Sequence, residues 1–329
     1  MLLIECEKVN VRFIMSCTVN KVEQTVSTQI DNMKQTVFDQ IGSMKQTVFD
    51  QIGSMKQTST EQAETDQNNA QQTENNVFNV LTSNGNYQCK SLVIATGGLS
   101  IPSAGATPFG YRIAEQFGIK IHPPRAALVP FTLNPTDKSM FAQLSGIAVD
   151  SIVKTGKQSF RENILFTHRG LSGPAILQIS LYWSPGESIT VNLLPEFNLF
   201  EWLIRQQQSF QNKKLKSILY DILPKRLVMA LIEEKYGEAK LGGISHKDLR
   251  LITQKIQQLE IRPDGTEGYR TAEVTAGGVD CDCIYSKTME ARAVKGLFFT
   301  GEVLDVTGWL GGYNLQWAWS SGWCAGRAA

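Results

Sequence analysis

Residues 297–329 constrain the fold of this chain more than any other stretch. The apolar run Leu297-Phe298-Phe299 is typical of a buried parallel strand. A loop with an acidic residue and the pair Gly311-Gly312 follows, and from residue 313 to residue 328 apolar and small residues recur at helical spacing. A strand, a loop and a helix N-terminus in this order present free N–H groups to an anionic or electron-rich ligand. By spacing alone, an ordinary strand-to-helix connection in an α/β sheet fits equally well.

The composition narrows the class of protein. A chain of 329 residues can hold two or three domains, and a formal net charge of +1 gives no reason to expect nucleic acid or an anionic membrane as partner. No apolar run reaches the roughly 18 residues of a membrane span. The N-terminal residues carry charges where a signal peptide needs an apolar core, so we expect a cytoplasmic protein.

Metal binding is not expected. Of the six cysteines, only Cys281 and Cys283 lie close together, and a C-x-C pair is too tight for the usual zinc spacing. Only three histidines could complete such a site. Reduced thiols are the plain interpretation of the cysteines.

Three other stretches carry patterns. LVIATGG at residues 92–98 is a strand that ends in a glycine turn, ILFTHRGLSGP spans residues 164–174, and VTAGGV spans residues 274–279. Together with TGEVLDVTGWLGGYNLQWAWSSGWCAGRAA at residues 300–329, they resemble the aminoacetone oxidase and bile-acid-reductase family of FAD-binding proteins. The four motifs occur in the family's order, and the resemblance covers roughly residues 1–22 and 77–329.

The resemblance implies an α/β fold with a discontinuous, Rossmann-like FAD-binding domain, incomplete here, that carries an inserted β-barrel-like domain and a helical insert. The expected parts are residues 1–125 for the partial FAD-binding domain, 126–195 for the β-barrel-like domain, 196–259 for the helical insert, 260–275 for the return strands of the barrel-like domain, and 276–329 for the C-terminal FAD-binding segment.

The resemblance also implies residues that contact FAD. Val19 would meet the adenine through backbone atoms. Thr96, Gly97 and Gly98 would pass close to the cofactor, since glycine leaves the backbone accessible.

The other implied contacts lie in the C-terminal segment. Gly301 and Asp305 would lie against the ribityl chain and the pyrophosphate, with Asp305 accepting a hydrogen bond from a hydroxyl group. Gly312 would let the backbone approach the ligand. Tyr313, Asn314 and Leu315 would offer N–H groups to the N1–O2 side of the flavin and stabilise the anionic reduced ring.

One part of the family pattern does not occur in the sequence. The family opens with a strand, a G-x-G-x-x-G turn and a helix whose N-terminus holds the FAD pyrophosphate. We therefore expect that this chain is an N-terminally truncated fragment and that it binds FAD weakly by itself.

The implied function is an FAD-dependent oxidoreductase. It would transfer a hydride between a small organic substrate and flavin, with NAD(P)H or oxygen as the second partner. The alternative is a non-catalytic fragment of such a flavoprotein. The sequence identifies no catalytic residue and no oligomeric state. His168 is either a proton donor or a hydrogen-bonded loop residue, and Arg169 could meet an acidic substrate or a nicotinamide phosphate.

An eleven-residue repeat interrupts the family pattern. The units at 22–32, 33–43 and 44–54 carry apolar residues at positions 1, 5 and 9, and the last two units also at position 6. This spacing predicts an amphipathic helix, and a polar segment follows to residue 76. We interpret residues 22–76 as a tandem-repeat and low-complexity insertion.

The remaining patterns predict local elements. We expect a strand over 11–15, a hairpin over 77–90, a domain boundary at Pro123-Pro124, and helices over 107–117, 171–181, 197–237 (two pieces around Pro224) and 245–259.

Overall fold

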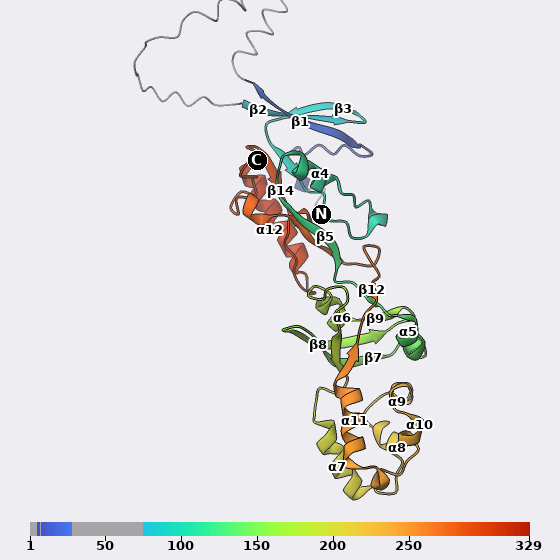
Figure 1. Cartoon of the computed structure of the whole chain (residues 1–329). Coiled ribbons are helices and arrows are strands. Elements are labelled where there is room, and N and C mark those ends of the chain that lie inside the picture. Colours follow the sequence, from blue (N-terminus) through green and yellow to red (C-terminus); the bar gives the residue numbers. More distant parts are fainter. Residues whose placement is uncertain (1–4, 7, 28–74) are drawn as a thin grey trace, which may run out of the picture. The chain divides into compact units, whose positions relative to one another are not determined.

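The computed structural model describes residues 5, 6, 8–27 and 75–329 (Figure 1). The chain divides into two units, and each is described by itself. The first consists of the described residues up to Leu92 together with Val294–Phe298 and Ala329. The second consists of Val93–Ala293 and Phe299–Ala328.

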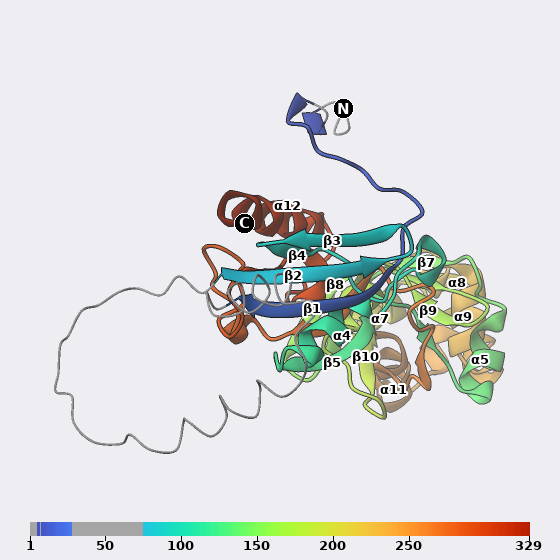
Figure 2. The same ribbon diagram turned by 90° about the horizontal axis from the view of Figure 1, so that it is seen from above.

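The first unit contains a three-stranded antiparallel sheet in the order β1-β2-β3 (Figure 2). The strands are β1 (Val19–Ser27), β2 (Asn75–Thr82) and β3 (Gly85–Cys89). Val22 and Phe78 are buried on this sheet. The tight β2–β3 connection confirms the predicted hairpin: Thr82 pairs with Gly85, whose φ of 125° suits only glycine.

Two predictions for the N-terminal region are wrong. Residues 11–14 form no strand, and the first strand begins at Val19. The predicted repeat helix is wrong for residues 22–27, because they belong to β1 and pair with β2, with Val22 opposite Val80. Apolar residues at positions 22 and 26 fit the two-residue alternation of a strand as well as helical spacing. Pairing with β2 makes this segment a strand. The rest of the repeat and the polar segment as far as residue 74 lie outside the described residues.

The register of β1 and β2 gives a testable prediction for the insertion. Ser27 and Asn75 are paired, so residues 28–74 connect two adjacent strand ends. Replacing 28–74 with Asn-Gly should leave the thermal unfolding midpoint unchanged or raise it, because a two-residue turn matches strand twist and closes a shorter loop. The midpoint is measured by circular dichroism. A fall of more than about 5 °C would contradict this prediction.

The second unit contains a seven-stranded antiparallel sheet in the order β11-β10-β7-β8-β9-β6-β12. The strands are β6 (Phe131–Thr132), β7 (Ala148–Thr155), β8 (Gln158–Phe166), β9 (Gly170–Ser172), β10 (Ile189–Asn192), β11 (Leu259–Ile261) and β12 (Gly265–Thr266).

The predicted barrel is not supported. Among the described strands, the edge strands β11 and β12 do not pair with each other, so the sheet stays open. Both edge strands are short, three and two residues, which leaves little backbone to close a ring.

The helical insert contains more helices than the sequence indicated. They are α7 (Leu199–Ser209), α8 (Leu215–Leu219), α9 (Lys225–Leu231), α10 (Glu234–Gly237), η3 (Leu241–Gly243) and α11 (His246–Gln257). The two pieces predicted over 197–237 are in fact four helices. The N-terminus of α11 agrees with the prediction, since the Ser245 side chain accepts a hydrogen bond from the Asp248 N–H at 3.1 Å. One apolar cluster joins these helices to the sheet, with Leu203, Ile218 and Ile256 packed in the same core as Phe131 and Val191.

The structure also differs from the sequence-based expectations at two helices. Helix α5 (Pro135–Ala142), capped by Asn134, was not predicted. Helix α6 (Pro174–Ile179) begins later than residue 171, because residues 170–172 pair as strand β9. The predicted boundary Pro123-Pro124 lies inside β5 (Ile121–Ala127), which among the described strands pairs with β13 (Val274–Val279) alone. Prolines are tolerated there because the other edge of β5 needs no amide donor.

The remaining elements surround the C-terminal segment. They are β4 (Leu92–Ile94), η2 (Pro102–Ala104), α4 (Phe109–Gln116), η4 (Cys281–Cys283), β14 (Leu297–Phe299), η5 (Gly301–Val303) and α12 (Tyr313–Ala328). The predicted C-terminal strand and helix are therefore confirmed, and so is the helix before Gly118. Helix α12 buries Ser321 and Ala325 and leaves Trp319 and Trp323 exposed. In the described part of the chain, no helix is long and apolar enough to span a membrane.

Candidate functional site

A cavity of about 450 Å³ lies in the second unit where the chain leaves β4 and β14 and enters α12. Four of its lining residues are glycines, at positions 97, 301, 311 and 312. Leu128, Val274 and Leu310 supply apolar walls, and Glu302 and Asn314 supply polar groups. A cavity with mostly apolar walls and a few polar groups is typical of a cofactor or small-molecule site.

Two of these glycines leave the backbone open to the cavity. Gly97 has a φ of 70° and Gly312 a φ of 90°, a region that residues with a Cβ rarely adopt. A Cβ added at either position would meet no protein atom within 4 Å. Peptide groups thus border open space here, which fits a ligand that packs directly on the backbone.

The N-terminus of α12 adds hydrogen-bond donors. The first intrahelical bond runs from the Gln316 N–H to the Gly312 carbonyl, at 2.9 Å, so the amides of residues 313–315 have no intrahelical acceptor. The Asn314 side chain closes the preceding loop: its oxygen accepts from the Gly308 N–H at 2.7 Å and its nitrogen donates to the Gly308 carbonyl at 3.1 Å. The loop is fixed by a side chain, which leaves the Asn314 backbone N–H for a ligand.

Helix α12 also holds the turn after β14. The Gly301 N–H donates to the Ser321 hydroxyl at 2.9 Å, and the Gly301 carbonyl accepts from the Trp317 indole at 3.1 Å. Ser321 is 1% exposed, so water does not compete for this contact. Both peptide groups that flank this cavity residue are therefore fixed.

Glu302 is a site residue that the sequence analysis missed. Its carboxylate accepts from the Thr275 N–H at 2.8 Å, and the Thr275 hydroxyl accepts from the N–H groups of Leu99, at 2.8 Å, and Ser100, at 3.1 Å. Burial raises the pKa of the Glu302 carboxyl, and the hydrogen bonds from Thr275 offset only part of this. The available signal in the sequence was an acid that follows a buried strand and a glycine.

The structure brings together five of the ten predicted cofactor residues. Gly97, Gly301, Gly312, Asn314 and Leu315 all line the cavity.

The other five lie outside the cavity lining. Gly98 packs against Thr275 and Glu302, and Thr96 lies beside Gly110. Tyr313 is 62% exposed. Asp305 lines a neighbouring pocket with His122, and Val19 belongs to β1 of the first unit. Cofactor binding by all ten residues remains a prediction.

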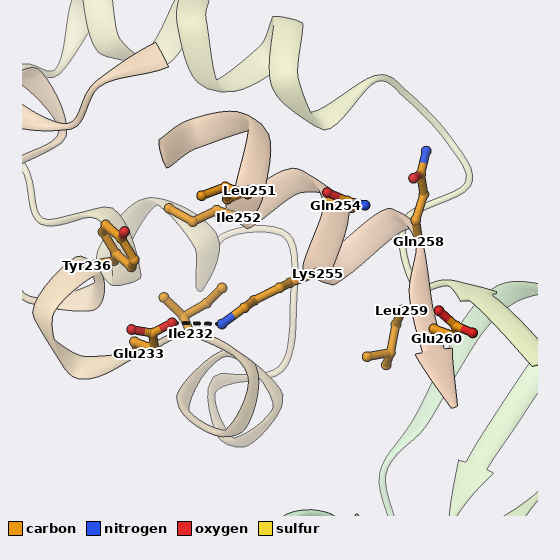
Figure 3. Close-up of a pocket in the computed structure, with 10 residues that line it drawn as sticks. All are labelled: Ile232, Glu233, Tyr236, Leu251, Ile252, Gln254, Lys255, Gln258, Leu259 and Glu260. Carbon is orange, nitrogen blue, oxygen red and sulfur yellow. Dashed lines mark hydrogen bonds and ion pairs between the residues drawn. The ribbon is translucent and has the colours of Figure 1, made fainter. Parts of the chain in front are cut away.

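A second pocket, of about 360 Å³, lies in the helical insert beside α10 and α11 (Figure 3). Lys255 points towards Glu233 there, and the two form an ion pair of 2.9 Å, while Lys235 binds the same carboxylate at 2.9 Å. These two lysines lower the pKa of Glu233 to about 2. The charges in this pocket pair with one another, so we assign no chemistry to it. No metal-binding group of His, Cys, Asp and Glu occurs among the described residues.

The comparisons with known proteins agree with this geometry. A family model described as the HI0933-like protein Rossmann domain matches residues 37–328. The chain belongs to this HI0933-like Rossmann family. The membership and the relatives below support a flavin-dependent oxidoreductase in general, as the sequence motifs implied, and suggest FAD as cofactor.

Curated relatives carry two different names. The chain is 55% identical over 242 residues to the ribosomal RNA dihydrouridine synthase of Haemophilus influenzae (73% of this chain, 60% of the relative). It is 54% identical over 240 residues to the Escherichia coli protein of that name (72% and 60%). It is 32% identical over 265 residues to the 3-dehydro-bile acid delta(4,6)-reductase of Clostridium scindens (74% and 63%). The chain thus spans about 60% of the length of these relatives.

The name that two of these relatives share refers to RNA, which bears on the expected absence of a nucleic-acid partner. That expectation rested on the net charge of +1, which is a sum over the whole chain. A small net charge does not exclude a local cluster of cations, so charge alone does not decide the substrate class.

The open space beside Gly312 gives a prediction for cofactor affinity. Gly312→Ala should weaken FAD binding about tenfold or more, because the methyl group would occupy ligand space. Gly105→Ala is the matched control: Gly105 has a φ of 95°, also meets no atom within 4 Å, and does not line the cavity. The two variants should lose similar thermal stability, while FAD titration by flavin fluorescence should separate them. Equal FAD affinities would contradict the assignment.

The partly buried carboxyl of Glu302 gives a prediction for pH dependence. Because the folded pKa of Glu302 is raised, its contribution to stability is fully present below the ordinary value of 4.5 and is lost as pH rises. Glu302→Gln should therefore raise the unfolding midpoint at pH 7 and bring no gain below pH 4.5. Glu115→Gln, at an exposed position of α4, is the control and should change the midpoint little at either pH. An unfolding midpoint of Glu302→Gln below that of the parent at pH 7 would contradict the claim that burial of the charged carboxylate is destabilising.

Proposed function

We propose that this chain holds the flavin of an FAD-dependent oxidoreductase whose substrate is a uridine of ribosomal RNA. The observation that carries the proposal is the glycine-lined cavity at the α12 N-terminus. This cavity lies in a chain that is 55% identical to a ribosomal RNA dihydrouridine synthase. The family membership supports the flavin part, and the relatives' name supports the substrate.

The reaction adds one hydride and one proton across the C5–C6 double bond of uracil and yields 5,6-dihydrouracil. Bound FAD would supply the two-electron carrier, with NAD(P)H as the source of the hydride. In this chain, Gly97 and Gly312 would let the cofactor pack on the backbone. The N–H groups of Tyr313, Asn314 and Leu315 would stabilise negative charge on the reduced ring, with Asn314 fixing their loop. No residue is assigned as the proton donor.

A small organic substrate is the second candidate. It is supported by the 32% identical bile-acid reductase and by the same cavity, whose apolar walls suit such a molecule. A chain without catalysis is the third outcome to be tested.

The test combines the purified chain, FAD, NADPH or NADH, and ribosomal RNA transcribed without modification. Nucleoside mass spectrometry should detect uridine that has gained two hydrogens, in an amount that depends on FAD. Unchanged RNA together with oxidation of NAD(P)H by an unsaturated bile acid would favour the second candidate. No flavin binding and no turnover would leave a non-catalytic fragment.

A further inference from the structure

The motif at residues 164–174 is not used by the cofactor cavity. A separate pocket of about 650 Å³ is lined by Thr167, His168 and Arg169 of its turn together with Glu267, Arg270 and Thr271. The Thr167 hydroxyl fixes the turn, since it accepts hydrogen bonds from the N–H groups of Arg169, at 3.2 Å, and Gly170, at 3.1 Å. His168 and Arg169 are therefore presented on a rigid turn.

One cation of this pocket is oriented by a nearly buried acid. Arg169 donates to the Glu267 carboxylate at 3.3 Å, and the Glu267 side chain is only 11% exposed. The Arg169 side chain is 41% exposed, so part of its guanidinium faces the pocket. A guanidinium carries five N–H donors in a fixed fork, and one carboxylate does not use them all.

A second cation has no such partner. Arg270 lines the same pocket, is exposed, and forms no ion pair with any described carboxylate. Glu267 is the one acid in the lining, against two arginines and one histidine. The pocket therefore has an excess of positive charge and donors that match a planar or tetrahedral oxyanion.

The pocket adjoins the cofactor cavity through two stretches of chain. Leu128 and Glu273 line the cavity, whereas Pro130 and Thr271 line the pocket. The stretches are joined by hydrogen bonds from the Glu273 N–H to the Leu128 carbonyl, at 3.2 Å, and from the Glu267 N–H to the Pro130 carbonyl, at 3.0 Å. The Cα atoms of Leu128 and Pro130 are at most roughly 7.6 Å apart, because consecutive Cα atoms lie ~3.8 Å apart. The pocket and the cavity are thus lined by residues two positions apart on the same two stretches of chain.

We propose that Arg270, Arg169 and His168 form a binding site for a phosphate group of the substrate, next to the base that reacts. The inference rests on the proposed function for the identity of the base, and on the pocket's geometry for the phosphate. The phosphate could belong to a free nucleotide or to an RNA backbone, and both present the same oxyanion to the arginines.

The test measures dissociation constants of the FAD-loaded full chain for uridine, uridine 5′-monophosphate and a short oligouridylate. Both phosphate-containing probes should bind at least about tenfold more tightly than uridine. Arg270→Gln should remove most of this difference and leave uridine binding unchanged. Arg205→Gln, on the exposed face of α7, is the matched control and should change nothing.

Equal binding of uridine and the two phosphate-containing probes, or equal losses in Arg270→Gln and Arg205→Gln, would overturn the proposal. Tighter binding of the oligouridylate than of the monophosphate assigns the site to an RNA backbone, and the reverse order assigns it to a free nucleotide. Thermal unfolding of each variant checks that the fold is intact. Phosphate-dependent binding without reduction of uridine would leave this site standing and reject the proposed function. If Arg270→Gln reduces uridine in RNA with an unchanged KM for the RNA, the proposed function stands and this phosphate site is rejected.

Discussion

The two hydrogen bonds between Gly301 and helix α12 are the contact on which the candidate cofactor site depends. Gly301 directly follows β14, and its N–H and carbonyl are bound by Ser321 and Trp317. The contact fixes the end of a buried strand against the body of the helix, so the helix N-terminus, with Gly312 before it, is held at the same cavity as the strand end. Free N–H groups at a helix N-terminus can bind a ligand only where they border a cavity, and this contact places the α12 N-terminus at the cavity.

A second network ties the cavity to segments that are distant in sequence. The Glu302 carboxylate binds Thr275 on β13, and Thr275 binds the chain that leaves β4 at Leu99 and Ser100. Three segments thus meet through Glu302 and Thr275: these two residues are 27 positions apart, and Leu99 lies 176 positions before Thr275. The raised pKa of Glu302 shows that this arrangement has an electrostatic cost, and buried groups of this kind are common at functional sites. The candidate site is therefore built from segments that are not contiguous in the sequence.

The sequence predicted the parts of this structure that depend on local chemistry. The strand and helix of residues 297–328 follow from apolar periodicity, and the α11 N-terminus follows from Ser245. Partner choice was not predictable: residues 22–27 form a strand because β2 is available, and the open sheet follows from pairings that no local pattern encodes. Five of the predicted cofactor residues line the cavity, whereas Asp305 lines another pocket and Glu302 was not predicted. A sequence motif identifies a segment near the cofactor but does not state which way each side chain faces.

The most direct test of this account compares Ser321→Ala with Ser320→Ala. Ser321 is buried and binds the Gly301 N–H. Ser320, the preceding residue of α12, is exposed, and its hydroxyl accepts a hydrogen bond from the Gln316 side chain. Leaving the Gly301 donor unsatisfied should lower the free energy of unfolding by about 1–3 kcal/mol. It should also weaken FAD binding in Ser321→Ala, while Ser320→Ala keeps the parent values of both. FAD affinity that is equal in the two variants would contradict the claim that this contact builds the cofactor site.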